Sequence, residues 1–233
     1  MKLIGLIGGM SWESSALYYS ELNRRVQARL GGLHSARTLL YSVDFHDIEA
    51  MQRAGEWVAA GQLLSRTAQA LESAGADFIV LCTNTMHKVA PAIEAAVRIP
   101  LLHIVDPTAA ELKRAGYRHV ALLGTRFTME QEFYRDRLRD AHGIEALVPD
   151  AVERAIVHRI IYEELCVGRV LESSRAQYRR IIEALVGHGA QAVILGCTEI
   201  TMLIGPQDAT VPVVDTTALH ARAAVELALA DPD

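Results

Sequence analysis

"AGADFIVLCTNT" (residues 74–85) and "HGAQAVILGCTE" (188–199) are two stretches of this chain that align without a gap. Gly75 pairs with Gly189, which is a shift of 114 residues (189 − 75 = 114). Each stretch is an apolar run followed by a cysteine, a hydroxyl and an amide or carboxylate. Such a run predicts a buried strand with a polar cluster at its carboxyl end.

Apolar runs rich in β-forming residues recur along the chain, and longer amphipathic segments separate them. The predicted strands are 2–8, 38–43, 78–82, 101–104, 120–124, 192–196 and 211–215. Helical patterns lie between them, for example in 12–30 and 56–75. Strands that are apolar throughout and joined by helices predict a parallel sheet covered on both faces. The predicted fold class is therefore α/β.

The repeat extends beyond the two opening stretches. "LIGLIGGM" (3–10) resembles "HVALLGTR" (119–126), and the segment from 99 resembles the segment from 211 with small gaps. We therefore predict two similar α/β lobes with parallel sheets, related by a pseudo-twofold axis. The first lobe would span 1–98 and be completed by a C-terminal helix in 212–233, and the second would span 99–211. The alternative is chance similarity between two strand–loop–helix units.

The repeat also predicts where a ligand binds. Ligands of open parallel sheets lie beyond the carboxyl ends of the strands, so an interlobe cleft would bring both polar clusters to one ligand. Two opposed proton-handling groups suit removal of a proton from one face of a carbon and its return to the other. The gapless alignment sets Thr83 opposite Cys197, since 83 + 114 = 197. Cys82 would then point away from that ligand, because successive strand residues face opposite sides.

Composition excludes several function classes. The chain has 233 residues and a formal net charge of −5, which gives no support to binding of nucleic acid or of an anionic membrane. No apolar stretch approaches the roughly 18 residues needed to span a bilayer. The N-terminal segment lacks the features of a signal peptide. Three cysteines without close metal-ligand spacing predict reduced thiols in the cytoplasm and no metal site.

Four motifs give the chain a family resemblance: "GLIGGMSWESS" (5–15), "CTNTMH" (82–87), "GCTE" (196–199) and "VPVVDTTALHA" (211–221). Over nearly its whole length the chain resembles the cofactor-independent aspartate/glutamate racemases, and most of all their L-aspartate/glutamate-specific branch. The resemblance implies two α/β lobes with the active site between them and a homodimer. It also implies an isomerase that uses no cofactor and whose substrate is a small acidic amino acid.

The resemblance also implies the catalytic residues. Cys197 falls on the catalytic thiol of the second lobe, and Thr83 stands where the first lobe of the family usually has a cysteine. The implied substrate-binding residues are Met10, Ser11, Gln52, Asn84, Thr85, Cys166, Thr198 and Glu199. Among them, Asn84, Thr85 and Thr198 would bind the α-carboxylate. Met10 and Ser11 would line the site near the substrate amine.

The group that binds the distal carboxylate stays open. Gln52 lies in the segment that would cover this carboxylate. Cys166 replaces a lysine that is common at the end of the "IYEEL" helix in the family. Arg53 and Lys88 are possible substitutes for that lysine.

These residues suggest a directional racemisation. The Cα–H of an amino acid is a very weak acid, so the site must stabilise a carbanion-like state electrostatically. A thiol at the mouth of a helix can become a thiolate base. The threonine hydroxyl cannot supply an alkoxide base at neutral pH, but it can donate a proton through a relay. We therefore expect Cys197 to take the proton from the L-isomer and the Thr83 side to return one, giving the D-product.

Each candidate also has a purely structural interpretation. Cys82 fits a small buried hydrophobe, and the threonines could be helix N-caps. Three histidines, His87, His103 and His220, fit packed or solvated positions better than catalytic ones. The arginines of "FYRDRLRD" and "QYRRI" fit solvated helix faces.

Other functions remain possible on the sequence. Cys197 could be the nucleophile of a thiol hydrolase, which predicts a trapped thioester rather than solvent hydrogen at Cα. A related fold could also carry a hydantoin racemase, a decarboxylase or a cis–trans isomerase. A non-enzymatic alternative is a two-lobed amino-acid sensor, which has no special need of Cys197.

Overall fold

The computed structural model describes residues 1–230 and shows an α/β protein with two four-stranded parallel sheets. The fold class expected from the sequence is confirmed: the protein has two α/β lobes, one for each sheet. One compact unit contains residues 1–104 together with the last helix from Thr217, and the other spans Val105–Thr216. The predicted domain limits of 98/99 and 211/212 stay a prediction.

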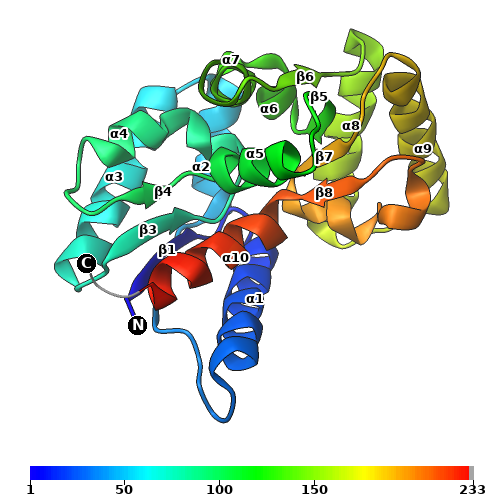
Figure 1. Cartoon of the computed structure of the whole chain (residues 1–233). Coiled ribbons are helices and arrows are strands. Elements are labelled where there is room, and N and C mark those ends of the chain that lie inside the picture. The colour runs from blue at the N-terminus through cyan, green and yellow to red at the C-terminus, as the bar shows by residue number, and fades with distance from the viewer. Residues whose placement is uncertain (231–233) are drawn as a thin grey trace. The chain divides into compact units, whose positions relative to one another are not determined.

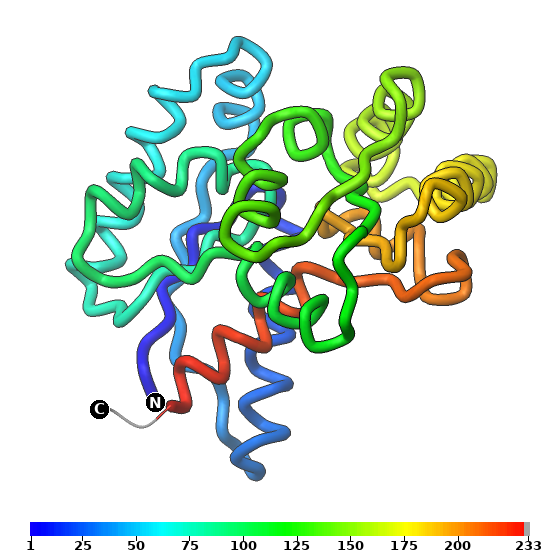
Figure 2. The backbone as a smooth tube through the Cα atoms, turned by 45° about the horizontal axis from the view of Figure 1, so that its top comes forward, coloured from blue at the N-terminus to red at the C-terminus, as the bar shows by residue number. Residues whose placement is uncertain are grey.

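The sheet of the first unit has the order β2-β1-β3-β4. Its strands are β1 (Ile4–Gly8), β2 (Thr38–Ser42), β3 (Phe78–Leu81) and β4 (Leu101–Leu102). The helices of this unit are α1 (Trp12–Leu30), α2 (Phe45–Ala54), α3 (Trp57–Ser73), η1 (Thr85–Val89), α4 (Ala90–Glu94) and α10 (Thr216–Leu229). Figures 1 and 2 show α1 and α10 side by side.

Alternating strand residues divide the first core into two layers. Leu6, Val80 and Cys82 pack with residues of α1 and α10, such as Tyr18 and Ala221. The intervening residues Ile7, Ile79 and Leu81 face the other way, toward α2 and α3. Both faces of the sheet are therefore buried, which explains why its strands are apolar throughout.

The sheet of the second unit has the order β6-β5-β7-β8. Its strands are β5 (His119–Gly124), β6 (Glu145–Leu147), β7 (Val193–Gly196) and β8 (Val213–Asp215). Its longer helices are α5 (Val105–Arg114), α8 (Ala151–Glu163) and α9 (Glu172–Gly187). Short segments complete it: α6 (Arg126–Glu130), α7 (Glu132–Asp136), η2 (Arg137–Ala141), η3 (Leu165–Val167), η4 (Thr198–Met202) and η5 (Pro206–Asp208).

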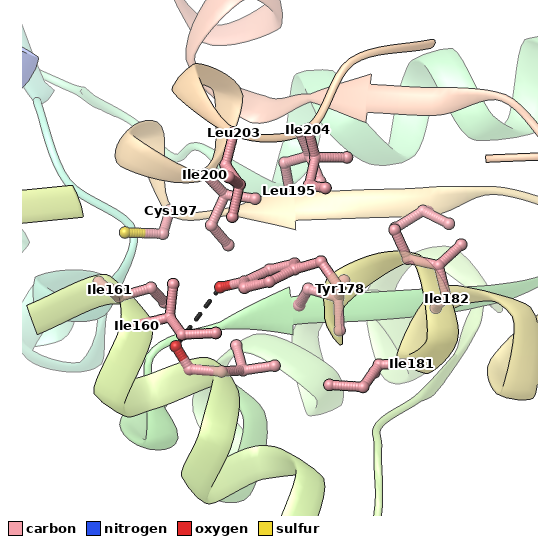
Figure 3. Packing of buried hydrophobic residues seen from close by; sticks show 14 of the residues in the cluster. Ile160, Ile161, Tyr178, Ile181, Ile182, Leu195, Cys197, Ile200, Leu203 and Ile204 are labelled. Carbon is pink, nitrogen blue, oxygen red and sulfur yellow. Dashed lines mark hydrogen bonds between the residues drawn. The ribbon is translucent and has the colours of Figure 1, made fainter. Parts of the chain in front are cut away.

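Side chains of β7, α8 and α9 form the core on one face of this second sheet. Figure 3 shows Leu195, Ile160 and Tyr178 in that cluster, with the Tyr178 hydroxyl donating to the carbonyl of Val157 at 3.4 Å. Cys197 lies at the edge of the cluster, immediately after β7, and its sulfur points away from Tyr178. The end of β7 thus leads from a packed core to the predicted catalytic position.

The strand registers reproduce the internal repeat. In the first sheet Ile79 of β3 is opposite Gly5 of β1, and in the second sheet Val193 of β7 is opposite Ala121 of β5. The shift from Ile79 to Val193 is 114 residues, as in the sequence alignment (193 − 79 = 114). Thr83 lies two residues after Leu81, and Cys197 lies two residues after the equivalent Leu195. They therefore occupy equivalent positions in their own sheets.

The seven predicted strands are all present, and one strand was missed. The missed strand is β6, three residues long, which pairs only with β5 at an edge of its sheet and begins with the exposed Glu145. The turns after β3 and β7 are 3₁₀ helices of five residues rather than α-helices. Among the helices of residues 1–230, none combines the length and the apolar character that crossing a bilayer requires.

Candidate active site

Thr83, Asn84 and Thr85 follow the carboxyl end of β3, at the start of η1. Asn84 and Thr85 are buried, whereas Thr83 is half-buried. Asn84 is the N-cap residue of η1, and its side chain makes no capping hydrogen bond to that helix. Thr83 is thus the member of this cluster that keeps some contact with solvent.

The backbone around Thr83 is held from several sides. Its N–H donates to the carbonyl of Leu81 at 2.8 Å, and the N–H of Cys82 donates to Ile7 of the neighbouring strand at 2.9 Å. The hydroxyl of Ser14, in the first turn of α1, donates to the carbonyl of Cys82 at 3.2 Å. These bonds fix the chain where it leaves the sheet.

Cys82 lies in the core between the sheet and helices α1 and α10. Its side chain is fully buried, and burial raises the pKa of its thiol far above the ordinary range. Cys82 and Leu81 lie on opposite faces of the sheet, as expected for successive residues at the end of a strand. Cys82 therefore has the environment of a structural, protonated thiol.

Met10 and Ser11 lie in the loop between β1 and α1. The N–H of Gly9 donates to the Ser15 hydroxyl at 2.8 Å, and a Cβ at Gly9, where φ is +90°, would collide with the backbone of Val43. Ser11 is the N-cap of α1, and its side chain accepts a hydrogen bond from the N–H of Ser14. Met10 is buried among apolar residues of the first core, and the Met10–Ser11 peptide bond is cis.

The residues expected near the distal carboxylate have varied surroundings. Gln52 is buried in α2 and donates from Nε2 to the sulfur of Met86 at 3.0 Å. Arg53 is exposed and pairs with Glu49 at 3.7 Å. The Lys88 ammonium lies 3.9 Å from the centre of the Trp57 ring, and burial lowers the pKa of this lysine. The structure thus brings Gln52, but not Arg53, into the buried part of the first unit.

Cys197 and Glu199 form a buried hydrogen-bonded pair after β7. The Cys197 thiol donates to Glu199 Oε2 at 2.9 Å, and the two side chains are 9% and 8% exposed. Thr198, between them, is buried at the start of η4. A thiol bonded to a carboxylate can pass its proton to that carboxylate, which is the arrangement of a nucleophile or base beside its proton acceptor.

The surroundings of Cys197 favour the thiol over the thiolate. Burial, and after it the negative charge of Glu199, raises the pKa of the Cys197 thiol well above its ordinary value. The five-residue η4 is a 3₁₀ helix, so it provides little of the dipole that stabilises a thiolate at an α-helix N-terminus. Both effects favour the protonated thiol, and the Glu199 carboxylate lies where it can accept the proton of Cys197.

Cys166 lies in η3, half-buried, and packs against the apolar cluster that includes Cys197. Glu164, the N-cap residue of η3, is buried and accepts hydrogen bonds from Arg159 at 2.8 Å and from the Ser174 hydroxyl at 2.5 Å. These bonds hold η3 against α8 and α9. Cys166 is thus fixed in the same unit as Cys197 and Glu199.

A buried carboxylate that the sequence analysis missed supports the loop after Cys197. Asp208 accepts hydrogen bonds from the N–H of Gly205 at 2.8 Å and from Arg179 at 2.7 Å, and it pairs with Arg175 at 3.2 Å. Arg175 also donates to the carbonyl of Leu203. The arginines of "QYRRI" are exposed, as expected, and Arg179 also reaches the buried carboxylate of Asp208 from that solvated face. The signal in the sequence was an acidic residue after a Gly-Pro turn, and only the fold brings it to α9.

The described residues show no arrangement typical of a metal centre. Within residues 1–230, no group of three or more histidine, cysteine, aspartate or glutamate side chains is arranged to hold a metal ion. The chemistry that these side chains can perform themselves is proton transfer, by the Cys197–Glu199 pair and by the hydroxyl of Thr83.

A comparison with protein families agrees with this chemistry. The family model for Asp/Glu/hydantoin racemases matches residues 7–224, which is most of the chain. The chain belongs to this family. The family consists of racemases, a class of isomerase, and it works without pyridoxal phosphate.

Individual relatives support the family and differ in substrate. A candidate Asp/Glu racemase from Yersinia pestis is 59% identical, with a TM-score of 0.93 over 99% of this chain and 100% of that one. An aspartate racemase homologue from Pyrococcus horikoshii OT3 is 35% identical, with a TM-score of 0.82 over 98% and 99% of the two chains. The broad specificity amino-acid racemase RacX of Bacillus subtilis (strain 168) is 25% identical over 98% of this chain and 99% of its own length.

Proposed function

We propose that this protein racemises the acidic amino acids L-aspartate and L-glutamate without a cofactor. Cys197 takes the proton from Cα, and the Thr83 side returns a proton to the opposite face. The observation that carries this proposal is the Cys197–Glu199 hydrogen bond of 2.9 Å at the carboxyl end of β7. A buried thiol bonded to a carboxylate suits a base that must be protonated at rest and deprotonated during the reaction.

The first step involves Cys197 and Glu199. The proton moves from Cys197 Sγ to the Glu199 carboxylate, which leaves a thiolate and a carboxylic acid. The thiolate then removes the Cα proton, and the electron pair of the Cα–H bond delocalises onto the α-carboxylate. A thiolate whose conjugate acid has a raised pKa is a stronger base toward carbon, so the burial that opposes its formation also strengthens it.

The second step uses the Thr83 hydroxyl. It donates a proton to the other face of Cα and takes one back from water, so no free alkoxide is formed. The hydroxide left by that water is neutralised by the proton that Glu199 releases to solvent, which restores the resting thiol and carboxylate. The partial exposure of Thr83 supports this relay. The reverse step would require an alkoxide base at neutral pH, which is why we expect the D-isomer to react more slowly than the L-isomer.

The α-carboxylate of the substrate must be held while it gains enolate character. We propose that Asn84, Thr85 and Thr198 supply hydrogen-bond donors to it, since all three are buried beside the proposed catalytic residues in their own units. Met10, Ser11, Gln52 and Cys166 complete the proposed binding set.

The test is a chiral assay without added cofactor. Purified protein is incubated with L-aspartate, L-glutamate and a panel of neutral and basic amino acids, and the enantiomers are separated by chromatography. D-aspartate or D-glutamate should appear with the wild type and be lost with Cys197→Ser, while Cys82→Ala should retain activity. Product formation that survives Cys197→Ser would contradict the proposal.

A second candidate function is racemisation of a broader range of amino acids. The observation that favours it is the similarity to RacX of Bacillus subtilis, described as a broad specificity racemase, over almost the whole of both chains. The same panel separates the two candidates. Rates with neutral or basic substrates that equal those with acidic ones would favour the broader function and would leave the roles of Cys197 and Thr83 intact.

A further inference from the structure

A buried histidine joins the loop of Thr83 to the end of β4. His87 lies in η1 and is 1% exposed. Its Nδ1 is 2.7 Å from the carbonyl oxygen of Thr83, and its Nε2 accepts a hydrogen bond from the N–H of Ile104 at 3.1 Å. The ring therefore bridges the proposed proton-donating residue and the segment that follows the edge strand.

The partners of His87 fix its tautomer. A backbone N–H can only donate, so Nε2 must accept from Ile104. A carbonyl oxygen can only accept, so Nδ1 must carry the hydrogen that is donated to Thr83. His87 is thus held as a neutral imidazole with its proton on Nδ1.

A second histidine fixes the same end of β4. His220 of α10 donates from Nε2 to the carbonyl of Leu102 at 2.8 Å, and its Nδ1 accepts from the Tyr18 hydroxyl at 2.8 Å. The centres of the His87 and His103 rings are 4.5 Å apart, and His103 lies between Leu102 and Ile104 in the chain. The segment around Ile104, to which His87 bonds, is therefore held in turn by Tyr18 of α1 and His220 of α10.

The carbonyl groups of Cys82 and Thr83 are therefore both hydrogen-bonded to side chains. Ser14 donates to the carbonyl of Cys82, and His87 donates to that of Thr83. The second sheet lacks this imidazole at the equivalent position. There the residue is Thr201 (87 + 114 = 201), whose hydroxyl donates to the carbonyl of Thr198 at 2.7 Å. The imidazole bridge is thus specific to the threonine side of the repeat.

We propose that His87 is a positioning residue for the return of the proton to Cα, acting through the backbone of Thr83. This inference rests on the proposed function and adds a residue to it. A hydroxyl is a much weaker acid than a thiol, so its proton donation depends strongly on alignment with Cα, and a displacement of about 1 Å can cost about 100-fold in rate. His87 opposes such a displacement while remaining neutral and away from the substrate.

Two substitutions separate the two hydrogen bonds of the ring. His87→Asn retains an amide donor near the position of Nδ1 and loses the acceptor for Ile104. His87→Gln retains an acceptor near Nε2 and loses the donor to Thr83. Both variants carry a neutral amide. A defect found in His87→Gln but not in His87→Asn is therefore due to loss of the bond to Thr83 rather than loss of the bond to Ile104.

The measurement is the partition of the reaction from L-aspartate in heavy water. Return of deuterium from the Cys197 side gives deuterated L-substrate, and return from the Thr83 side gives D-product. His87→Gln should lower the ratio of D-product to deuterated L-substrate by about tenfold or more, and His87→Asn should keep this ratio within about twofold of the wild type. An unchanged ratio in His87→Gln, with exchange on the Cys197 side intact, overturns the inference and leaves the proposed function standing.

Controls distinguish positioning from general loosening. His220→Asn removes the donor to Leu102 but no bond to Thr83, so it should lower the unfolding temperature and shift the ratio much less than His87→Gln does. An equal shift of the ratio in His220→Asn would overturn the inference. Absence of any exchange in the wild type would instead overturn the proposed function itself.

A measurement on the wild type keeps the inference testable where a variant does not fold. Nitrogen-15 NMR of the imidazole should show His87 neutral, with its proton on Nδ1, between pH 6 and pH 9. A protonated Nε2 or a titrating imidazolium at this residue would contradict the hydrogen-bond pattern on which the inference depends.

Discussion

At the scale of single residues, the two buried thiols differ in what lies beside the sulfur. Cys82 lies in an apolar core with its sulfur 3.8 Å from the carbonyl oxygen of Val80, whereas Cys197 donates to the carboxylate of Glu199. Burial raises the pKa of both thiols. Only the thiol with a carboxylate partner has a built-in proton acceptor, and this separates the catalytic candidate from the structural cysteine.

Replacing Glu199 by glutamine tests that difference. The glutamine can still accept a hydrogen bond from the thiol but cannot take its proton. The rate with L-aspartate at pH 7 should fall by roughly 10²-fold. It should recover partly as the pH rises, because the proton of Cys197 must then leave to solvent. The measurement is kcat between pH 6 and pH 10, and a profile identical to that of the wild type would contradict the role of Glu199.

A double substitution checks that the two residues act in one step. Because Cys197 and Glu199 share a single proton transfer, Cys197→Ser with Glu199→Gln should lose little more activity than Cys197→Ser alone. Losses that multiply would show that Glu199 acts elsewhere.

Cys82→Ala should affect stability rather than catalysis. We expect a loss of about 1 kcal/mol in the free energy of unfolding at pH 7, with kcat retained. Because the pKa of Cys82 is raised in the folded state, its contribution is fully present below the unfolded thiol pKa of about 8.5 and decreases above it. Urea unfolding from pH 7 to pH 10 should therefore show the two proteins converging. Parallel curves would be inconsistent with a buried, protonated Cys82.

At the scale of secondary-structure elements, one buried carboxylate ties α9 to the turns after Cys197. Burial alone would raise the pKa of Asp208, but the N–H of Gly205 and the guanidinium groups of Arg179 and Arg175 hold it below its ordinary value. Asp208→Asn should cost about 3 kcal/mol in the free energy of unfolding at pH 7, since the buried side chain of Asp208 loses its charge-assisted hydrogen bonds to Arg175 and Arg179. Urea unfolding measures this cost.

The dependence on pH and a matched control identify the cause. A depressed pKa contributes stability above the unfolded pKa of about 3.9, so the difference between wild type and Asp208→Asn should shrink as pH falls through the folded pKa of Asp208. Glu172 pairs with the same Arg175 but is 74% exposed. Glu172→Gln should cost at most about 0.5 kcal/mol. Equal costs for the two variants would show that burial of the pair is unimportant.

The sequence predicted the elements well where local patterns decide them. Apolar β-rich runs predicted seven strands, because both faces of each sheet are buried and the strands have few polar residues. The pattern could not predict β6, whose three residues form a strand by pairing with β5 alone. It also could not predict the Asp208 cluster or the contacts of His87, because these bonds join residues far apart in the chain.

At the scale of the whole molecule, the internal repeat carries most of the functional argument. The shift of 114 residues found in the sequence equals the shift between the registers of β3 and β7, so the candidate pair Thr83 and Cys197 followed from the sequence alone. The family resemblance supplied the reaction. The contact between Cys197 and its proposed proton acceptor Glu199 could not be predicted from the sequence, because a glutamate two residues after a cysteine also fits an exposed first-turn carboxylate.

The central claim is that a thiol and a hydroxyl act on opposite faces of one Cα. Deuterium wash-in in heavy water tests it most directly, with L- and D-aspartate as separate substrates and Thr83→Cys as the comparison. The wild type should exchange the Cα hydrogen of the L-isomer at least about tenfold faster than that of the D-isomer, and Thr83→Cys should bring the two rates together. Equal rates from both enantiomers in the wild type would contradict the account.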